Sequence, residues 1–145
     1  MAIIQRSALV PYSARQMFEL VNNVEDYPQF LPWCASSRVL ESTGTQIEAE
    51  LNITWKGISK SFTTRNLLHP YERMEILLVS GPFRQLEGRW TFTPLKPEAC
   101  KIALDLEFEF AGNILDKLFQ PIFNHIANSL VDAFSKRATE IYGPA

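Results

Sequence analysis

Two histidines and two cysteines are the residues of this chain with the most familiar metal and redox chemistry. His69 and His125 lie far apart, with no other ligand types at the spacing of a metal site. Cys34 and Cys100 form no CxxC motif, and two isolated cysteines are not a disulfide framework. We therefore expect buried free thiols, surface or partly buried histidines, and no metal site.

A row of carboxylates is the remaining candidate for catalysis. Asp105, Glu107 and Glu109 alternate with apolar residues, which is typical of the solvated side of an outer strand. A general acid needs a dry site that raises its pKa, and nothing in the pattern provides one. The chain also contains no GxSxG, GxGxxG or GxxxxGK motif. The sequence therefore predicts a non-enzymatic protein with no catalytic residue.

Large apolar side chains are the chain's most distinctive feature, since it has 10 Phe, 3 Trp and 4 Tyr. Binding sites for small molecules are mostly apolar concavities. We expect such a cavity, with its entrance near an aromatic loop at residues 27–33 and a Gly-Pro-Phe turn at 81–83. The candidate ligand-binding residues are Tyr27, Phe30, Trp33, Leu51, Ile53, Trp55, Met74, Ile76, Phe83, Trp90, Phe92, Leu104, Leu106, Phe119 and Phe123.

Charge is unevenly distributed although the formal net charge is only −2. Residues 55–101 carry 8 basic and 4 acidic side chains, whereas the flanking segments are acidic. RNA binding would need a basic patch to offset phosphates, and a solvated sheet face would explain the same residues. The candidate RNA or ribosome contacts are Lys56, Lys60, Arg65, Arg73, Arg84 and Arg89.

The elements that must position these residues follow from periodicity. Apolar and polar residues alternate cleanly at 46–55 and 99–110, and turn residues bound further strand-like runs at 3–10, 36–42, 58–68, 71–80 and 84–93, which predicts about seven strands. Helical spacing predicts a helix over 14–22, with Ser13 and Gln16 as a capping box, and a long helix from 114 to 142. At most one further short helical turn is expected within 26–33, because prolines interrupt that segment.

Short connections between strands imply antiparallel pairing. The expected fold is α+β, a helix grip in which a curved antiparallel sheet wraps a long C-terminal helix. The 145 residues are the usual size of one domain, so we expect a single domain over 1–145. With no membrane-length apolar run and no signal-peptide pattern, a cytoplasmic location is expected.

Three segments carry a resemblance to a known family: YPQFLPWC at 27–34, GISKSFTTRN at 57–66, and GPF at 81–83. With the helix-grip order, they resemble the START-like superfamily, in its coenzyme-Q-binding and polyketide-cyclase-type branch. The resemblance implies two functions. Some relatives bind ubiquinone and support respiration, and others are described as toxins that bind the large ribosomal subunit and prevent subunit joining.

The main interpretation is a non-enzymatic protein that holds ubiquinone or a similar prenyl lipid in its cavity and supports respiration. The alternative is inhibition of translation through the large ribosomal subunit, and a polyketide-cyclase-like enzyme is a distant third. No cofactor is expected apart from such a bound lipid. We expect no DNA partner and no transmembrane segment. Transient contact with a membrane would be compatible with a protein that holds a prenyl lipid.

Overall fold

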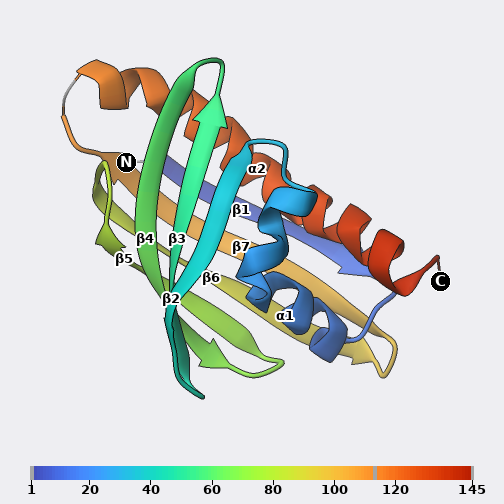
Figure 1. The fold of residues 1–145 in the computed structure, drawn as a ribbon. Helices are drawn as coiled ribbons and strands as arrows, with labels where there is room; N and C mark the ends of the chain where they lie inside the picture. The colour runs from blue at the N-terminus through green and yellow to red at the C-terminus, as the bar shows by residue number, and fades with distance from the viewer. Residues whose placement is uncertain (1, 113, 145) are drawn as a thin grey trace.

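The structure, a computed structural model, describes residues 2–112 and 114–144, with side chains except those of 114–116. Its elements follow the order that the sequence predicts (Figure 1). They are β1 (Ala2–Val10), α1 (Ala14–Asn22), the 3₁₀ helix η1 (Val24–Gln29), β2 (Cys34–Ser42), β3 (Gln46–Trp55), β4 (Ile58–His69), β5 (Arg73–Ser80), β6 (Phe83–Lys96), β7 (Ala99–Phe110) and α2 (Ile114–Tyr142).

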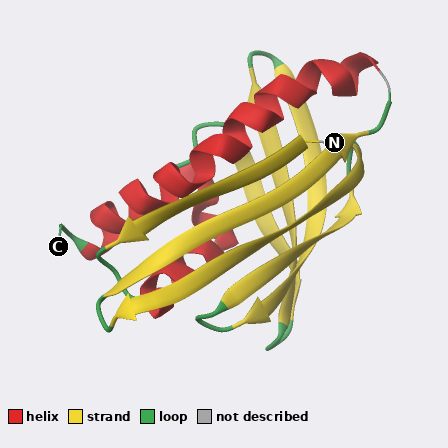
Figure 2. Cartoon of the chain, turned by 180° about the vertical axis from the view of Figure 1, so that it is seen from behind, coloured by secondary structure: helices red, strands yellow, loops and turns green. Residues whose placement is uncertain are grey.

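The described strands form one antiparallel sheet of seven strands in the order β1-β7-β6-β5-β4-β3-β2. The sheet curves around α2, and α1 and η1 lie beside the C-terminal half of that helix (Figures 1 and 2). This arrangement confirms the expected α+β helix grip. Among the described residues, no helix combines the length and apolar character needed to cross a membrane.

The first helix begins where the capping pattern predicts. The Ser13 hydroxyl accepts a hydrogen bond from the Gln16 backbone N–H (3.1 Å), and the Gln16 side chain accepts one from the Ser13 N–H (2.9 Å). These two bonds satisfy amide groups that a helix start leaves without partners. The next segment departs from expectation, because η1 spans six residues and starts at Val24, before the predicted turn.

Several strand boundaries also differ from the prediction: the second strand starts at Cys34 rather than at 36, and two larger differences have a local cause. The fifth strand starts at Arg73, because Tyr71 has a positive φ of 68° that belongs to the turn before it. The sixth strand continues past Pro94 to Lys96. A register shift between Pro94 and Lys96 lets the strand tolerate a residue without an N–H donor.

The C-terminal end of α2 is fixed to the start of the chain by two tyrosines. The Tyr12 hydroxyl donates to the Gly143 carbonyl (2.7 Å), and the Tyr142 hydroxyl donates to the Gln16 carbonyl (2.9 Å). Midway along the helix, Arg6 of the edge strand β1 donates to the Asn128 carbonyl (3.2 Å). These contacts hold α2 across the concave face and so set the space between helix and sheet.

Candidate functional site

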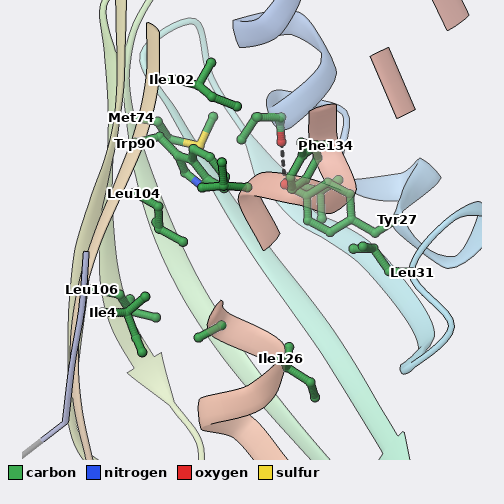
Figure 3. Packing of buried hydrophobic residues seen from close by; sticks show 14 of the residues in the cluster. Ile4, Tyr27, Leu31, Met74, Trp90, Ile102, Leu104, Leu106, Ile126 and Phe134 are labelled. Atoms are coloured by element: carbon green, nitrogen blue, oxygen red, sulfur yellow. Dashed lines mark hydrogen bonds between the residues drawn. The ribbon is translucent and has the colours of Figure 1, made fainter. Parts of the chain in front are cut away.

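A cavity of about 100 Å³ lies between the concave face of the sheet and α2. Its walls come from η1 and the following loop, from strands β3 to β7, and from α2; Figure 3 shows part of this packing. The wall residues are Val24, Tyr27, Trp33, Ala49, Leu51, Ile53, Phe62, Thr64, Asn66, Met74, Ile76, Leu86, Trp90, Leu106, Phe123, Ile126, Ala127, Leu130 and Phe134.

The cavity is narrow because aromatic rings fill most of the space. Phe134 of α2 packs edge-on against Tyr27 and Trp90, with ring centroids 5.4 and 5.3 Å apart. Pockets for drug-sized ligands enclose roughly 300–1,000 Å³, whereas an apolar cavity of about 150 Å³ accepts benzene. In this conformation the cavity therefore suits a group of about one ring, and a prenyl chain would require α2 or η1 to move.

Many of the predicted residues lie together in this cavity. They are Tyr27, Trp33, Leu51, Ile53, Met74, Ile76, Trp90, Leu106 and Phe123. Sequence reasoning missed wall residues of η1, β3, β4 and β6 and of the middle of α2, although strand parity and the apolar helix stripe were available as signals. The missed residues are Val24, Ala49, Phe62, Thr64, Asn66, Leu86, Ile126, Ala127, Leu130 and Phe134.

The other predicted residues lie outside the cavity wall and pack elsewhere. Phe92 stacks on Trp90, with ring centroids 6.4 Å apart, and Leu104 is buried on β7. The Phe119 ring meets Phe110 edge-on at 5.7 Å, and Trp55 is half-buried. Phe92 and Leu104 face inward as strand parity predicts, but close packing, including that of Phe18 from α1 on Phe92, keeps them out of the cavity wall.

The two proposed entrance aromatics are also packed. Phe83 is buried and contacts Phe110, with ring centroids 4.6 Å apart. Phe30 packs edge-on against Phe134 at 5.3 Å, and the Arg137 guanidinium lies 5.0 Å from the Phe30 ring centre. Neither ring lines the cavity, so an opening at either position would require these contacts to break.

Two polar side chains of the cavity wall come from β4. Thr64 and Asn66 are each 7% exposed, and the Thr64 hydroxyl donates to the Asn66 side-chain oxygen at 3.1 Å. Tyr27 directs its hydroxyl away from the cavity, to the Val21 carbonyl. Burial raises the pKa of Tyr27 well above its usual value, so the phenol stays protonated.

Both cysteines are buried free thiols, as the sequence predicts. Burial raises the pKa of Cys34 to about 11, and it raises the pKa of Cys100 to about 11 as well. The thiolate is the reactive form, and at pH 8 it would be on the order of a thousandth of each thiol. Neither cysteine has the exposure or acidity of a nucleophile.

These pKa values predict slow thiol chemistry in the folded protein. We expect both cysteines to resist Ellman's reagent at pH 8 and to react completely in 6 M guanidinium chloride. Because the folded-state pKa values are raised, stability should be unaffected below pH 8.5 and should fall between about pH 9 and 11, as the unfolded thiols ionise first. Rapid labelling of either cysteine in the native protein would contradict this burial.

The predicted basic residues do not form one uninterrupted patch. Arg65 on β4 pairs with Glu48 across the strands (3.2 Å), and Arg73 pairs with Glu75 (3.8 Å). Arg89 lies in register between Glu75 and Asp105. The remaining candidates are Lys56 in the β3–β4 turn, Lys60 on β4 and Arg84 on β6.

Metal binding finds no support in the side chains that the structure describes. Within them, no group of three or more His, Cys, Asp or Glu residues converges on a point. His69 contacts Glu75 at 3.4 Å, and the His125 ring lies 6.1 Å from the Trp55 ring. Both histidines therefore have structural neighbours that account for their positions.

A curved antiparallel sheet closed by a long helix over an apolar cavity defines a helix-grip protein of the START-like class. The family model described as "Polyketide cyclase / dehydrase and lipid transport" matches residues 10–135. The chain therefore belongs to this START-like family, as the three segments quoted above predict.

Among curated relatives, the chain is 49% identical over 140 residues to "Ribosome association toxin RatA" of Pseudomonas aeruginosa, covering 97% of both proteins. The RatA protein of Escherichia coli K12 is 50% identical over 139 residues, which are 96% of this chain and 88% of that protein. A "Coenzyme Q-binding protein COQ10 homolog B, mitochondrial" of Xenopus laevis is 28% identical over 94% of this chain and 58% of that protein.

Solved structures confirm the fold. The Zhui aromatase/cyclase of Streptomyces superimposes with a TM-score of 0.85 at 15% identity, covering 99% of both chains. A START superfamily protein of Mycobacterium smegmatis gives 0.79 at 21% identity, over 96% of this chain and 98% of that one. At sequence identities this low, the similarity to these two structures supports a common fold and does not indicate a common function.

Proposed function

We propose that this chain associates with the ribosome, as the name of the RatA relatives describes, and that it thereby inhibits translation. Identity near 50% over almost the full length of two such relatives carries this proposal. The sequence alone favoured ubiquinone binding as the main function and kept ribosome association as the alternative. The comparisons favour that alternative, because the coenzyme-Q-binding relative is much less similar.

The proposed mechanism is steric and needs no chemical step. Binding to the large subunit and prevention of subunit joining is one of the two functions that the START-like resemblance implies, and we expect it to take place in the cytoplasm. A rigid helix grip can block a subunit interface by occupying it. The buried, poorly reactive thiols are consistent with a non-enzymatic role.

Sedimentation of the purified protein with purified ribosomal particles tests the proposal. We expect the protein to migrate with the 50S subunit in a sucrose gradient and to stay at the top when the subunit is omitted. Serum albumin at the same concentration serves as a control for trapping. Absence of the protein from the 50S fractions at low salt would overturn the proposal.

Charge reversal on the outer face gives a second, residue-level prediction. The double variant Arg65→Glu/Arg73→Glu removes two positive charges and adds two negative ones beside Glu48 and Glu75, so it should repel RNA phosphates. We expect 50S affinity to fall by about tenfold at 0.1 M salt, and the difference to shrink at 0.5 M because salt screens exposed charges.

A control with the same net charge change is Arg15→Glu/Lys136→Glu, at exposed positions on α1 and α2. This variant should bind 50S subunits like the unmodified protein. Equal binding by both double variants would show that strands β4 and β5 do not face the ribosome, and the contact surface would have to lie elsewhere.

A second candidate function is the holding of a small apolar ligand in the cavity. The apolar wall between sheet and α2 favours it, as does the name of the Xenopus relative. Solvent extraction and mass spectrometry of protein purified from its own host test this candidate. A stoichiometric quinone or prenyl lipid would support it, and an empty protein would count against it. The cyclase neighbours share only the fold and do not extend this proposal to catalysis.

A further inference from the structure

We propose that Asn66, together with Thr64 and Trp90, forms a hydrogen-bond donor site that selects apolar ligands carrying an acceptor oxygen, such as a ring carbonyl. This inference rests on the second candidate function, in which the cavity holds a ligand. It adds the chemical group that the ligand must carry and the residues that recognise it.

Asn66 is a polar residue at an inward-facing position of β4. Its strand partners are Ile47 on β3 and Ile76 on β5, which are apolar, and the side chain is 93% buried in the cavity wall. Its single hydrogen bond is the one that it receives from Thr64. Among the described residues, no hydrogen bond joins the Asn66 amide nitrogen to another group, and this nitrogen is not one of the fully enclosed atoms without a partner, so it stays accessible.

Counting hydrogens makes this conclusion independent of how the amide is oriented. The Asn66 amide has two N–H groups and the Thr64 hydroxyl has one O–H, so the pair offers three hydrogens. One contact joins the two side chains and uses one of them, whichever residue donates. Two donors therefore remain for a third group in either orientation.

Trp90 adds another donor to the same wall. It is 4% exposed and lines the cavity, and its indole nitrogen can only donate. Within the described part of the chain, this N–H makes no hydrogen bond and is not one of the fully enclosed atoms without a partner, whereas the ring itself packs against Phe92 and Phe134. The indole therefore has a fixed orientation and a free hydrogen.

Spare donors in an apolar cavity select for acceptors. A buried N–H without a partner is unfavourable, and more so than a carbonyl with one unused lone pair. A ligand oxygen would satisfy the Asn66 or Trp90 hydrogens, whereas a hydrocarbon of the same shape would leave them unpaired. The cavity of about 100 Å³ limits the recognised part to about one ring.

Two ring-sized probes of similar shape test the proposal: cyclohexanone, and methylenecyclohexane, in which CH₂ replaces the carbonyl oxygen. Each is titrated into ¹⁵N-labelled protein while the Asn66 side-chain amide and the Trp90 indole signals are followed by NMR. We expect cyclohexanone to shift both signals. In Thr64→Val/Asn66→Leu its affinity should fall about tenfold, with methylenecyclohexane unchanged within about twofold.

The matched control is Asn52→Leu, the same replacement on the outward face of the neighbouring strand, which should leave both affinities unchanged. Trp90→Phe provides an independent variant that keeps a ring and removes the N–H, and it should also weaken cyclohexanone selectively. If both probes bind and every variant binds them equally well, the proposed donor site is wrong, but the proposal that the cavity holds a ligand still stands. If neither probe shifts cavity signals, both ideas fail.

Discussion

Replacing Phe123 with alanine should destabilise the protein by about 3–5 kcal/mol. The Phe123 side chain is 5% exposed, and it lies between sheet and helix. Its ring centre is 4.7 Å from that of Phe108, 5.0 Å from Phe83 and 6.0 Å from Phe62. Truncation removes all of these contacts at once and leaves space that α2 can close only partly.

Urea unfolding followed by circular dichroism measures this loss. A domain of this size has a stability of roughly 5–15 kcal/mol, so the variant should lose a large share of it and melt about 10 °C lower. Leu118→Ala is the matched control on the same helix, because Leu118 is 56% exposed, and it should change stability by less than about 0.5 kcal/mol. A cost below about 1 kcal/mol for Phe123→Ala would mean that α2 does not pack on the sheet as described.

Replacing Gly88 with valine should cost about 3 kcal/mol or more. A Cβ at position 88 would lie 2.6 Å from the Asp105 carbonyl oxygen and 2.7 Å from a Leu106 methyl carbon. The nearer atom belongs to the backbone of the paired strand β7, so it cannot rotate away. Relief requires β6 and β7, two inner strands of the sheet, to separate, and this should cost more than ordinary overpacking of a core side chain.

Gly44→Val provides the comparison, because no atom lies within 4 Å of the corresponding Cβ in the turn between β2 and β3. We expect Gly44→Val to fold with stability within about 0.5 kcal/mol of the unmodified protein. Equal stability of the two valine variants would contradict the β6–β7 register on which the cavity wall depends.

Strand periodicity was sufficient to predict the sheet and the side chains that face α2. In β3 and β7 the alternation predicted inward-facing Leu51, Ile53, Leu104 and Leu106, and all four are buried or partly buried. Whether an inward residue lines a cavity or fills the core depends on the local distance between helix and sheet. Leu104 and Leu106 share one face of β7, yet Leu106 lines the cavity and Leu104 does not.

Polar residues on β4 show a different limit of sequence reasoning. Thr64 and Asn66 resemble ordinary strand residues in the sequence, yet their partners Ala49 and Ile47 place them on the concave face. Partner identity depends on register, which one sequence does not specify. The same limit applies to Arg65, whose pairing with Glu48 joins residues far apart in the chain.

The measurement that tests the proposed ribosome function most directly is subunit joining. Purified 30S and 50S subunits are mixed at a magnesium concentration that favours 70S ribosomes, and light scattering follows their association with increasing protein. The account predicts that 70S formation falls in proportion to the 50S subunits occupied by the protein, and that Phe123→Ala inhibits only below its melting temperature. Unchanged association at a saturating concentration of folded protein would contradict the proposed function.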